Sequence, residues 1–287
     1  MSNTLIGAAD LHRALAQAGR DDIVVLDCGF DLTDPQAGRR QYEAGHLPGA
    51  AYVHLDDTLS GVKTGKNGRH PLPDRAGFAR AMAALGIGSR TQVVAYDNAG
   101  GMFAARLWWL LRWIGHDAVA VLDGGVAAWT AAGYPLTTEA PPQRAAGQLP
   151  VGDSLQPTID YPQLRQALNA GKHVVLDARA PDRYRGENET LDAVGGHIPG
   201  ARNRFFRDNL APDGRFLSPE QLRQDFTSRM NGRAPADVIN QCGSGVTACH
   251  NLLAMEVAGL TGAALYPGSW SEWSAQADAP VATGPEA

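Results

Sequence analysis

The chain contains an internal duplication, and this duplication constrains its fold more than any other feature of the sequence. The motif VVLD occurs twice, and the motif GHLPGA returns as GHIPGA. The paired segments are 24–27 with 174–177, 45–50 with 196–201, 93–97 with 238–242, and 123–129 with 267–273. Because the repeat is far longer than one unit of a solenoid, the pattern predicts two homologous domains.

The length and the region between the two copies support the same division. A chain of 287 residues is longer than most single hydrophobic cores. Segment 141–157, between the copies, is rich in proline, glutamine and glycine, which is typical of a linker. We therefore expect a first domain over 1–140, a linker over 141–157 and a second domain over 158–287.

Short apolar runs alternate with segments of helical periodicity, which predicts an α/β fold. In the first copy, strands are expected over 23–26, 93–96 and 119–122, and helices over 9–18, 76–85 and 103–113. Strand–helix alternation predicts a parallel sheet with helices on both faces in each copy. Ligands of such sheets bind at the carboxyl ends of the strands.

Composition and missing motifs exclude several classes of protein. The net charge is −5 and the pI about 5.9, so no nucleic-acid partner is expected. No apolar run is long enough for a membrane span, and the first residues do not resemble a signal peptide, so we expect a cytoplasmic protein. Three cysteines do not make a disulfide framework. No metal-ligand spacing, dinucleotide fingerprint or Walker loop occurs, so neither metal nor cofactor is expected.

The segment NQCGSGVTACH places a cysteine where chemistry is expected. Cys242 follows the strand-like run 238–241 and precedes the helical run 248–259. Backbone N–H groups at a helix start favour negative charge, and the glycines at 243 and 245 let the loop curl around an anion. These surroundings favour the thiolate. The alternative is that Cys242 is a small buried core residue, which is the interpretation we adopt for Cys28 and Cys249.

Several motifs together resemble the tandem-domain sulfurtransferases of the rhodanese superfamily. The loop CGSGVTA is similar to the active-site loop of the mercaptopyruvate-type members. Both GH(L/I)PGA motifs, the segment 123–129 and GSWSEW at 268–273 match the family over nearly the whole chain. In the family only the second domain keeps the nucleophile, and here Asp97 stands where Cys242 stands in the second copy. Trp270 and Trp273 are expected in the interior.

The resemblance implies sulfur transfer through a persulfide on Cys242. The donor would be 3-mercaptopyruvate and the acceptor cyanide, a thiol or thioredoxin. Thiosulfate is an alternative donor, and a non-catalytic sulfur-carrier or partner-binding module is a second alternative. A third alternative is a redox sensor based on Cys242. A phosphatase of the Cys-x5-Arg type is not expected, because Ala248 occupies the arginine position.

The resemblance also assigns roles to individual residues. The catalytic set is Cys242 with a proton relay of Ser244, His46 and Asp34. The donor-binding set is Arg183, Gly243, Gly245, Val246, Thr247, Arg179 and Phe103, with Arg183 on the donor carboxylate and Phe103 in an apolar cleft wall. Three assignments have structural alternatives: Arg179 as part of an ion pair, His46 as a turn residue, which His197 repeats, and Phe103 as plain core packing. Segment 187–195 is acidic and lacks the second arginine that mercaptopyruvate enzymes often carry there.

Overall fold

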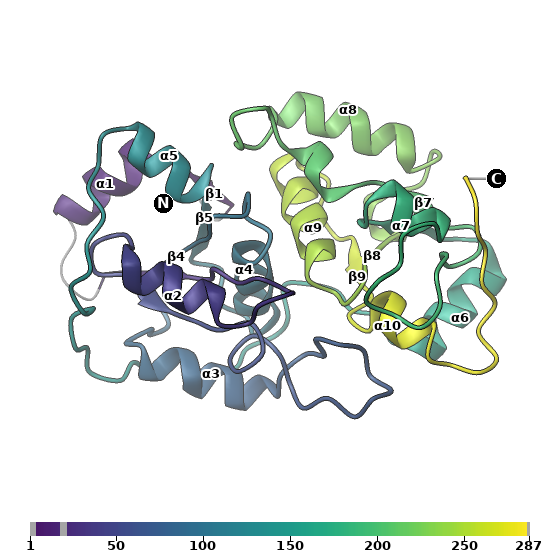
Figure 1. The fold of residues 1–287 in the computed structure, drawn as a ribbon, viewed down its shortest axis with the longest axis horizontal. Helices are drawn as coiled ribbons and strands as arrows, with labels where there is room; N and C mark the ends of the chain where they lie inside the picture. The colour runs from purple at the N-terminus through teal and green to yellow at the C-terminus, as the bar shows by residue number, and fades with distance from the viewer. Residues whose placement is uncertain (1–3, 18–21, 286–287) are drawn as a thin grey trace. The chain divides into compact units, whose positions relative to one another are not determined.

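The computed structural model describes residues 4–17 and 22–285, and the chain divides into two compact units (Figure 1). Unit 1 comprises Met1–Gly61, Pro73–Leu155 and Leu210–Phe216. Unit 2 comprises Val62–Leu72, Gln156–Asn209 and Leu217–Ala287. No motif or periodicity indicates that segment 62–72 belongs to unit 2 or segment 210–216 to unit 1, and the domain boundaries expected from the sequence remain a prediction.

Unit 1 is built on a five-stranded, entirely parallel sheet of order β1-β5-β4-β2-β3. Its strands are β1 (Leu5–Ile6), β2 (Ile23–Asp27), β3 (Ala51–Tyr52), β4 (Gln92–Tyr96) and β5 (Val119–Leu122). Its helices are α1 (Ala8–Gln17), α2 (Ala37–Ala44), α3 (Arg75–Ala84), α4 (Ala104–Trp113) and α5 (Gly125–Ala131). The predicted strands and helices are found within one or two residues, and Ala18, at the end of the first expected helix, lies outside the described residues.

Unit 2 repeats this sheet in the order β7-β6-β8-β9, again with parallel pairing only. The strands are β6 (Val174–Asp177), β7 (Arg202–Asn203), β8 (Val238–Gln241) and β9 (Ala264–Leu265). The helices are α6 (Tyr161–Ala170), α7 (Pro181–Arg185), α8 (Pro219–Arg229), α9 (Thr247–Val257) and α10 (Ser269–Trp273), with short 3₁₀ turns η1 (Phe206–Asn209) and η2 (Pro235–Asp237). Thr158 pairs with Leu265 where β1 pairs with β5 in unit 1. The α/β prediction of two parallel sheets is confirmed.

Local sequence explains where the helices of unit 2 begin. Asp160 and Gln163 form a reciprocal capping box at the start of α6, and Ser218 and Gln221 form another at the start of α8. In both helices a proline stands in the first turn, where its missing N–H leaves no hydrogen bond unmade. The strands, by contrast, are short runs of buried β-branched and other apolar residues.

The duplication extends to the cores. Trp129 and Trp273 are both at most 1% exposed, and each donates its indole N–H to a backbone carbonyl at 2.9 Å, Pro135 in unit 1 and Pro280 in unit 2. Trp270 is also fully buried, so the predicted interior position of both C-terminal tryptophans is confirmed. Within the described residues, no helix is both long and apolar enough to cross a membrane.

Candidate active site

Cys242 lies at the carboxyl end of β8, between that central strand and the start of α9. Its side chain is almost completely buried, and two backbone N–H groups of the following loop point at the sulfur. The distances to Sγ are 3.1 Å from the Gly245 nitrogen and 3.5 Å from the Ser244 nitrogen. Donors fixed in this way stabilise a negatively charged sulfur.

The loop keeps its shape because Gly245 occupies a conformation closed to other residues. Its φ is +77°, and a Cβ there would lie 2.4 Å from the Pro267 carbonyl oxygen. Two hydrogen bonds join the loop to helix α10. The Cys242 N–H donates to Ser269 Oγ at 3.1 Å, and the Ser271 N–H donates to the Gly243 carbonyl at 3.0 Å. The two N–H groups are therefore held in place before any substrate arrives.

The corresponding loop of unit 1 surrounds the side-chain carboxylate of one of its own residues, Asp97. Asp97 follows β4 as Cys242 follows β8, and its carboxylate accepts four backbone hydrogen bonds of 2.8–2.9 Å. The donors are the N–H groups of Ala99, Gly101, Phe103 and Ala104. The duplicated loop is thus an anion-binding loop in unit 1, and by homology in unit 2.

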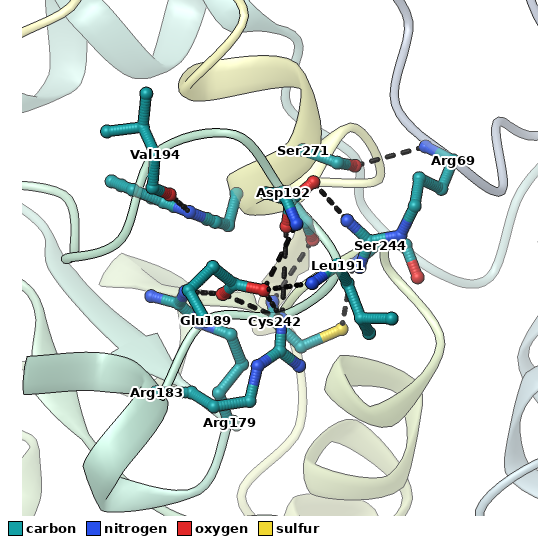
Figure 2. A network of polar contacts seen from close by, with 12 residues as sticks. Arg69, Arg179, Arg183, Glu189, Leu191, Asp192, Val194, Cys242, Ser244 and Ser271 are labelled. Carbon is teal, nitrogen blue, oxygen red and sulfur yellow. Dashed lines mark hydrogen bonds and ion pairs between the residues drawn. The ribbon is translucent and has the colours of Figure 1, made fainter. Parts of the chain in front are cut away.

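Arginine and carboxylate side chains surround the Cys242 loop (Figure 2). Arg183 donates to both oxygens of Glu189 at 2.8 Å and lies 3.9 Å from Asp192. Asp192 also pairs with Arg69. Burial acts to raise the pKa of Glu189, but the hydrogen bonds from Arg183 and from the backbone N–H groups of Leu191 and Asp192, together with the Arg183 charge, outweigh it, so the pKa is lowered.

Arg179 has structural contacts. Its guanidinium is buried, donates to both oxygens of Asp177 and to the Gly196 carbonyl, and lies over the ring of Trp270. Burial acts to lower the pKa of Arg179, yet the nearby acidic groups, Asp177 first and Glu189 after it, together more than compensate and the pKa is raised. The contacts favour the ion-pair alternative for this residue.

The histidine that contacts Ser244 is His70. Its Nδ1 lies 2.7 Å from Ser244 Oγ, and both side chains are buried. Sequence reasoning placed His46 in this role, but the ring nitrogens of His46 lie 2.7 and 3.0 Å from the carbonyls of Tyr42 and Glu139. His70 belongs to the segment 62–72, which no repeated motif marks, so only the three-dimensional contact identifies it.

His46 instead repeats a structural arrangement. His46 stacks on Tyr42 with ring centroids 3.9 Å apart, and His197 stacks on Tyr184 at 3.7 Å. Each histidine also places Nδ1 within hydrogen-bond distance of the carbonyl of the tyrosine on which it stacks. The recurrence of this pair in both units favours the turn-residue alternative for His46.

The other predicted site residues divide between the two units. Val246 and Thr247 form the start of α9 in unit 2. Asp34 is an exposed residue of unit 1 whose pKa is lowered by its hydrogen bond with Arg40. Phe103 is buried in unit 1 and packs edge-on against Phe30.

Cys28 and Cys249 are fully buried, as expected for core residues. Among residues 4–17 and 22–285, no cluster of His, Cys, Asp or Glu could hold a metal ion.

Comparison with known proteins identifies the family. A model of the rhodanese-like domain matches residues 8–132 and again 160–276. A probable 3-mercaptopyruvate sulfurtransferase of Pseudomonas aeruginosa is 48% identical over 94% of this chain and 95% of its own length. A thiosulfate sulfurtransferase of Cricetulus griseus is 37% identical over 88% of this chain and 85% of its own. The crystal structure of the 3-mercaptopyruvate sulfurtransferase SseA from Escherichia coli matches with a TM-score of 0.80 and 27% identity, over 94% of this chain and 99% of SseA. The chain therefore belongs to the rhodanese family of sulfurtransferases, and it carries the family's domain twice.

Proposed function

We propose that the chain transfers sulfur from 3-mercaptopyruvate to a thiophilic acceptor through a persulfide on Cys242. The observation that carries the proposal is the pair of loop N–H groups at 3.1 and 3.5 Å from the Cys242 sulfur. They favour the thiolate that attacks the donor, and they also stabilise the anionic persulfide that results. The names of the relatives support the same reaction.

In the first half-reaction the Cys242 thiolate attacks the sulfur of the donor. A sulfur–sulfur bond forms, the carbon–sulfur bond breaks, and its electron pair leaves with carbon as the enolate of pyruvate. The enolate then takes a proton, which the hydrogen-bonded pair of His70 and Ser244 is placed to deliver. Ser244 is suited to this because its own backbone N–H contacts the reacting sulfur.

In the second half-reaction the acceptor attacks the terminal sulfur of the persulfide. Cyanide gives thiocyanate, a thiol gives a new persulfide, and in each case the Cys242 thiolate is regenerated without net oxidation. We place the reaction in the cytoplasm, with reduced thioredoxin as a protein acceptor. The double displacement predicts ping-pong kinetics.

Thiosulfate is the second candidate donor, because relatives of similar length carry that name. The attack is the same, with sulfite as the leaving group. The loop itself favours 3-mercaptopyruvate, since Gly243 and Ser244 supply no charge beside the cysteine, and a dianion would gain more than a monoanion from basic residues there.

Steady-state kinetics with cyanide as acceptor test the proposal. We expect the wild type to turn over 3-mercaptopyruvate with a higher kcat/KM than thiosulfate. Cys242→Ser should lose turnover with both donors, whereas Cys249→Ala, at a buried position of α9, should retain it. Mass spectrometry after donor treatment should show one added sulfur atom on the peptide that contains Cys242.

Two results would contradict the proposal. Turnover by Cys242→Ser would remove the nucleophile assignment. A wild type that gains one sulfur atom on Cys242 but completes no further cycles with any small acceptor would instead indicate a sulfur-carrier module.

A further inference from the structure

A second cation lies beside the Cys242 loop, on a segment remote from it in sequence. Arg69 belongs to 62–72, which is part of unit 2. Its backbone N–H donates to Ser271 Oγ at 3.0 Å, so its main chain is fixed to α10, the helix that also fastens the loop. Figure 2 shows the Arg69 side chain in the same polar network as Arg183 and Asp192.

The two guanidinium groups flank the residue that follows the nucleophile. A Cβ built on Gly243 would lie 2.9 Å from Arg69 Nη2 and 3.6 Å from Arg183 Nη1. An anionic donor that reaches the Cys242 sulfur therefore comes close to two positive charges. Segment 187–195 lacks an arginine, but the fold supplies one from a different segment.

Two carboxylates of segment 187–195 neutralise these cations. Glu189 binds Arg183 through both oxygens, and Asp192 binds Arg69. The side chains of Glu189 and Asp192 are 4% and 8% exposed, whereas those of Arg183 and Arg69 are 20% and 27% exposed. The two carboxylates are thus more buried than the two arginines, and the formal charges of the four groups cancel.

Asp192 is less constrained than Glu189. Glu189 also accepts the backbone N–H groups of Leu191 and Asp192 at 2.9 and 3.2 Å and lies 3.6 Å from Arg179, so it organises the segment. Asp192 Oδ2 is buried without a hydrogen-bond partner among the described residues. The negative charge of Asp192 therefore faces Arg69 directly and lies 3.9 Å from Arg183.

We propose that Asp192, by neutralising Arg69, sets the charge of the donor that the site accepts. The inference rests on the proposed function and adds a determinant of donor choice to it. At neutral pH 3-mercaptopyruvate carries one negative charge and thiosulfate two. A carboxylate beside the site repels the dianion about twice as strongly as the monoanion, so Asp192 favours the carboxylate donor.

The test compares Asp192→Asn with the wild type for both donors. The variant should raise the ratio of kcat/KM for thiosulfate to kcat/KM for 3-mercaptopyruvate about tenfold, because Arg69 becomes available to the dianion. The gain should disappear in the double variant Arg69→Gln/Asp192→Asn. Glu187→Gln is the matched control, since Glu187 lies in the same segment but forms an exposed pair with Arg185 at 2.6 Å; it should leave the ratio unchanged.

A second readout needs no sulfur donor. The rate of Cys242 alkylation by anionic iodoacetate, divided by the rate with neutral iodoacetamide, reports the local charge. This quotient should rise about tenfold in Asp192→Asn and fall in Arg69→Gln. Mass spectrometry of the Cys242 peptide separates its labelling from that of the other cysteines.

The outcomes separate this inference from the proposed function. If the wild type is active and Asp192→Asn changes both donors equally, or keeps its gain without Arg69, the inference is wrong and the proposed function stands. If the wild type turns over neither donor, the proposed function fails. In that case the ratio of the iodoacetate to the iodoacetamide rate still tests whether Asp192 controls the charge at Cys242. If this ratio does not rise in Asp192→Asn, the inference is wrong.

Discussion

Gly245 is the position at which a single methyl group should do most damage to the site. Its φ of +77° lies in the left-handed region, and an added Cβ would lie 2.4 Å from the Pro267 carbonyl oxygen. The obstacle is backbone, so no change of rotamer relieves it. Gly245→Ala must move either the loop that positions two N–H groups at the Cys242 sulfur or the segment that leads into α10.

The expected cost has two parts. Placing alanine in the left-handed region costs about 1 kcal/mol, and forcing an extra carbon into a closed space costs about 1–3 kcal/mol more. Gly245→Ala should therefore lower the free energy of unfolding by about 3 kcal/mol. Gly171→Ala measures the first part alone, since Gly171 has a φ of +62° with nothing within 4 Å of an added Cβ.

Urea unfolding followed by tryptophan fluorescence measures these differences, because Trp270 and Trp273 are buried in unit 2. Gly171→Ala should cost about 1 kcal/mol and keep full activity. Gly245→Ala should cost more and lose most sulfur transfer. If Gly245→Ala unfolds no more easily than Gly171→Ala, the loop is not held rigidly by Pro267 and the argument for preformed N–H donors fails.

Two further predictions concern a buried carboxyl and the histidines. Burial raises the pKa of Asp27 from its ordinary value near 3.8 to about 6, so the stability that the protonated carboxyl contributes is present below about pH 4 and is lost as the pH rises through 6. Relative to Asp27→Asn, the free energy of unfolding of the wild type should fall by up to about 3 kcal/mol over this interval. A constant difference between the two proteins in urea unfolding from pH 4 to pH 8 would contradict this prediction. His70→Gln should lower kcat for 3-mercaptopyruvate about 10–100-fold and kcat for thiosulfate less, since sulfite leaves without needing a proton. His46→Gln should change the free energy of unfolding but not the ratio of kcat for the two donors. Equal effects of both variants on that ratio would contradict a proton relay through His70.

The duplication explains why so much of the fold could be predicted. Each repeated apolar run reports a buried parallel strand, and two copies with the same order fix two sheets of the same topology. The position of Cys242 followed from the same pattern, because a strand, two glycines and a helix place the intervening residue at the carboxyl edge of the sheet. All of these signals are local in sequence.

Other parts of the candidate site depend on contacts that no local pattern encodes. His70 and Arg69 lie on a segment without helix or strand over 62–72, and they reach Ser244 and Asp192 over more than a hundred residues of chain. The family resemblance assigns the proton relay to His46 because it stands in a recognisable motif, whereas we propose His70 for that relay because it contacts Ser244. The motif marks a repeated turn, whereas the contact with Ser244 is set by tertiary packing.

The two loops of the duplicated chain illustrate how one scaffold serves opposite purposes. In unit 1 the Asp97 carboxylate, with two oxygens, satisfies four backbone N–H groups and occupies the loop permanently. In unit 2 the Cys242 sulfur offers one acceptor atom, and two N–H groups contact it. A persulfide adds a second acceptor atom that carries the negative charge. Because this loop type already stabilises a two-atom anion in unit 1, we infer that the loop of unit 2 is better matched to the persulfide of the proposed reaction than to the single sulfur atom of Cys242.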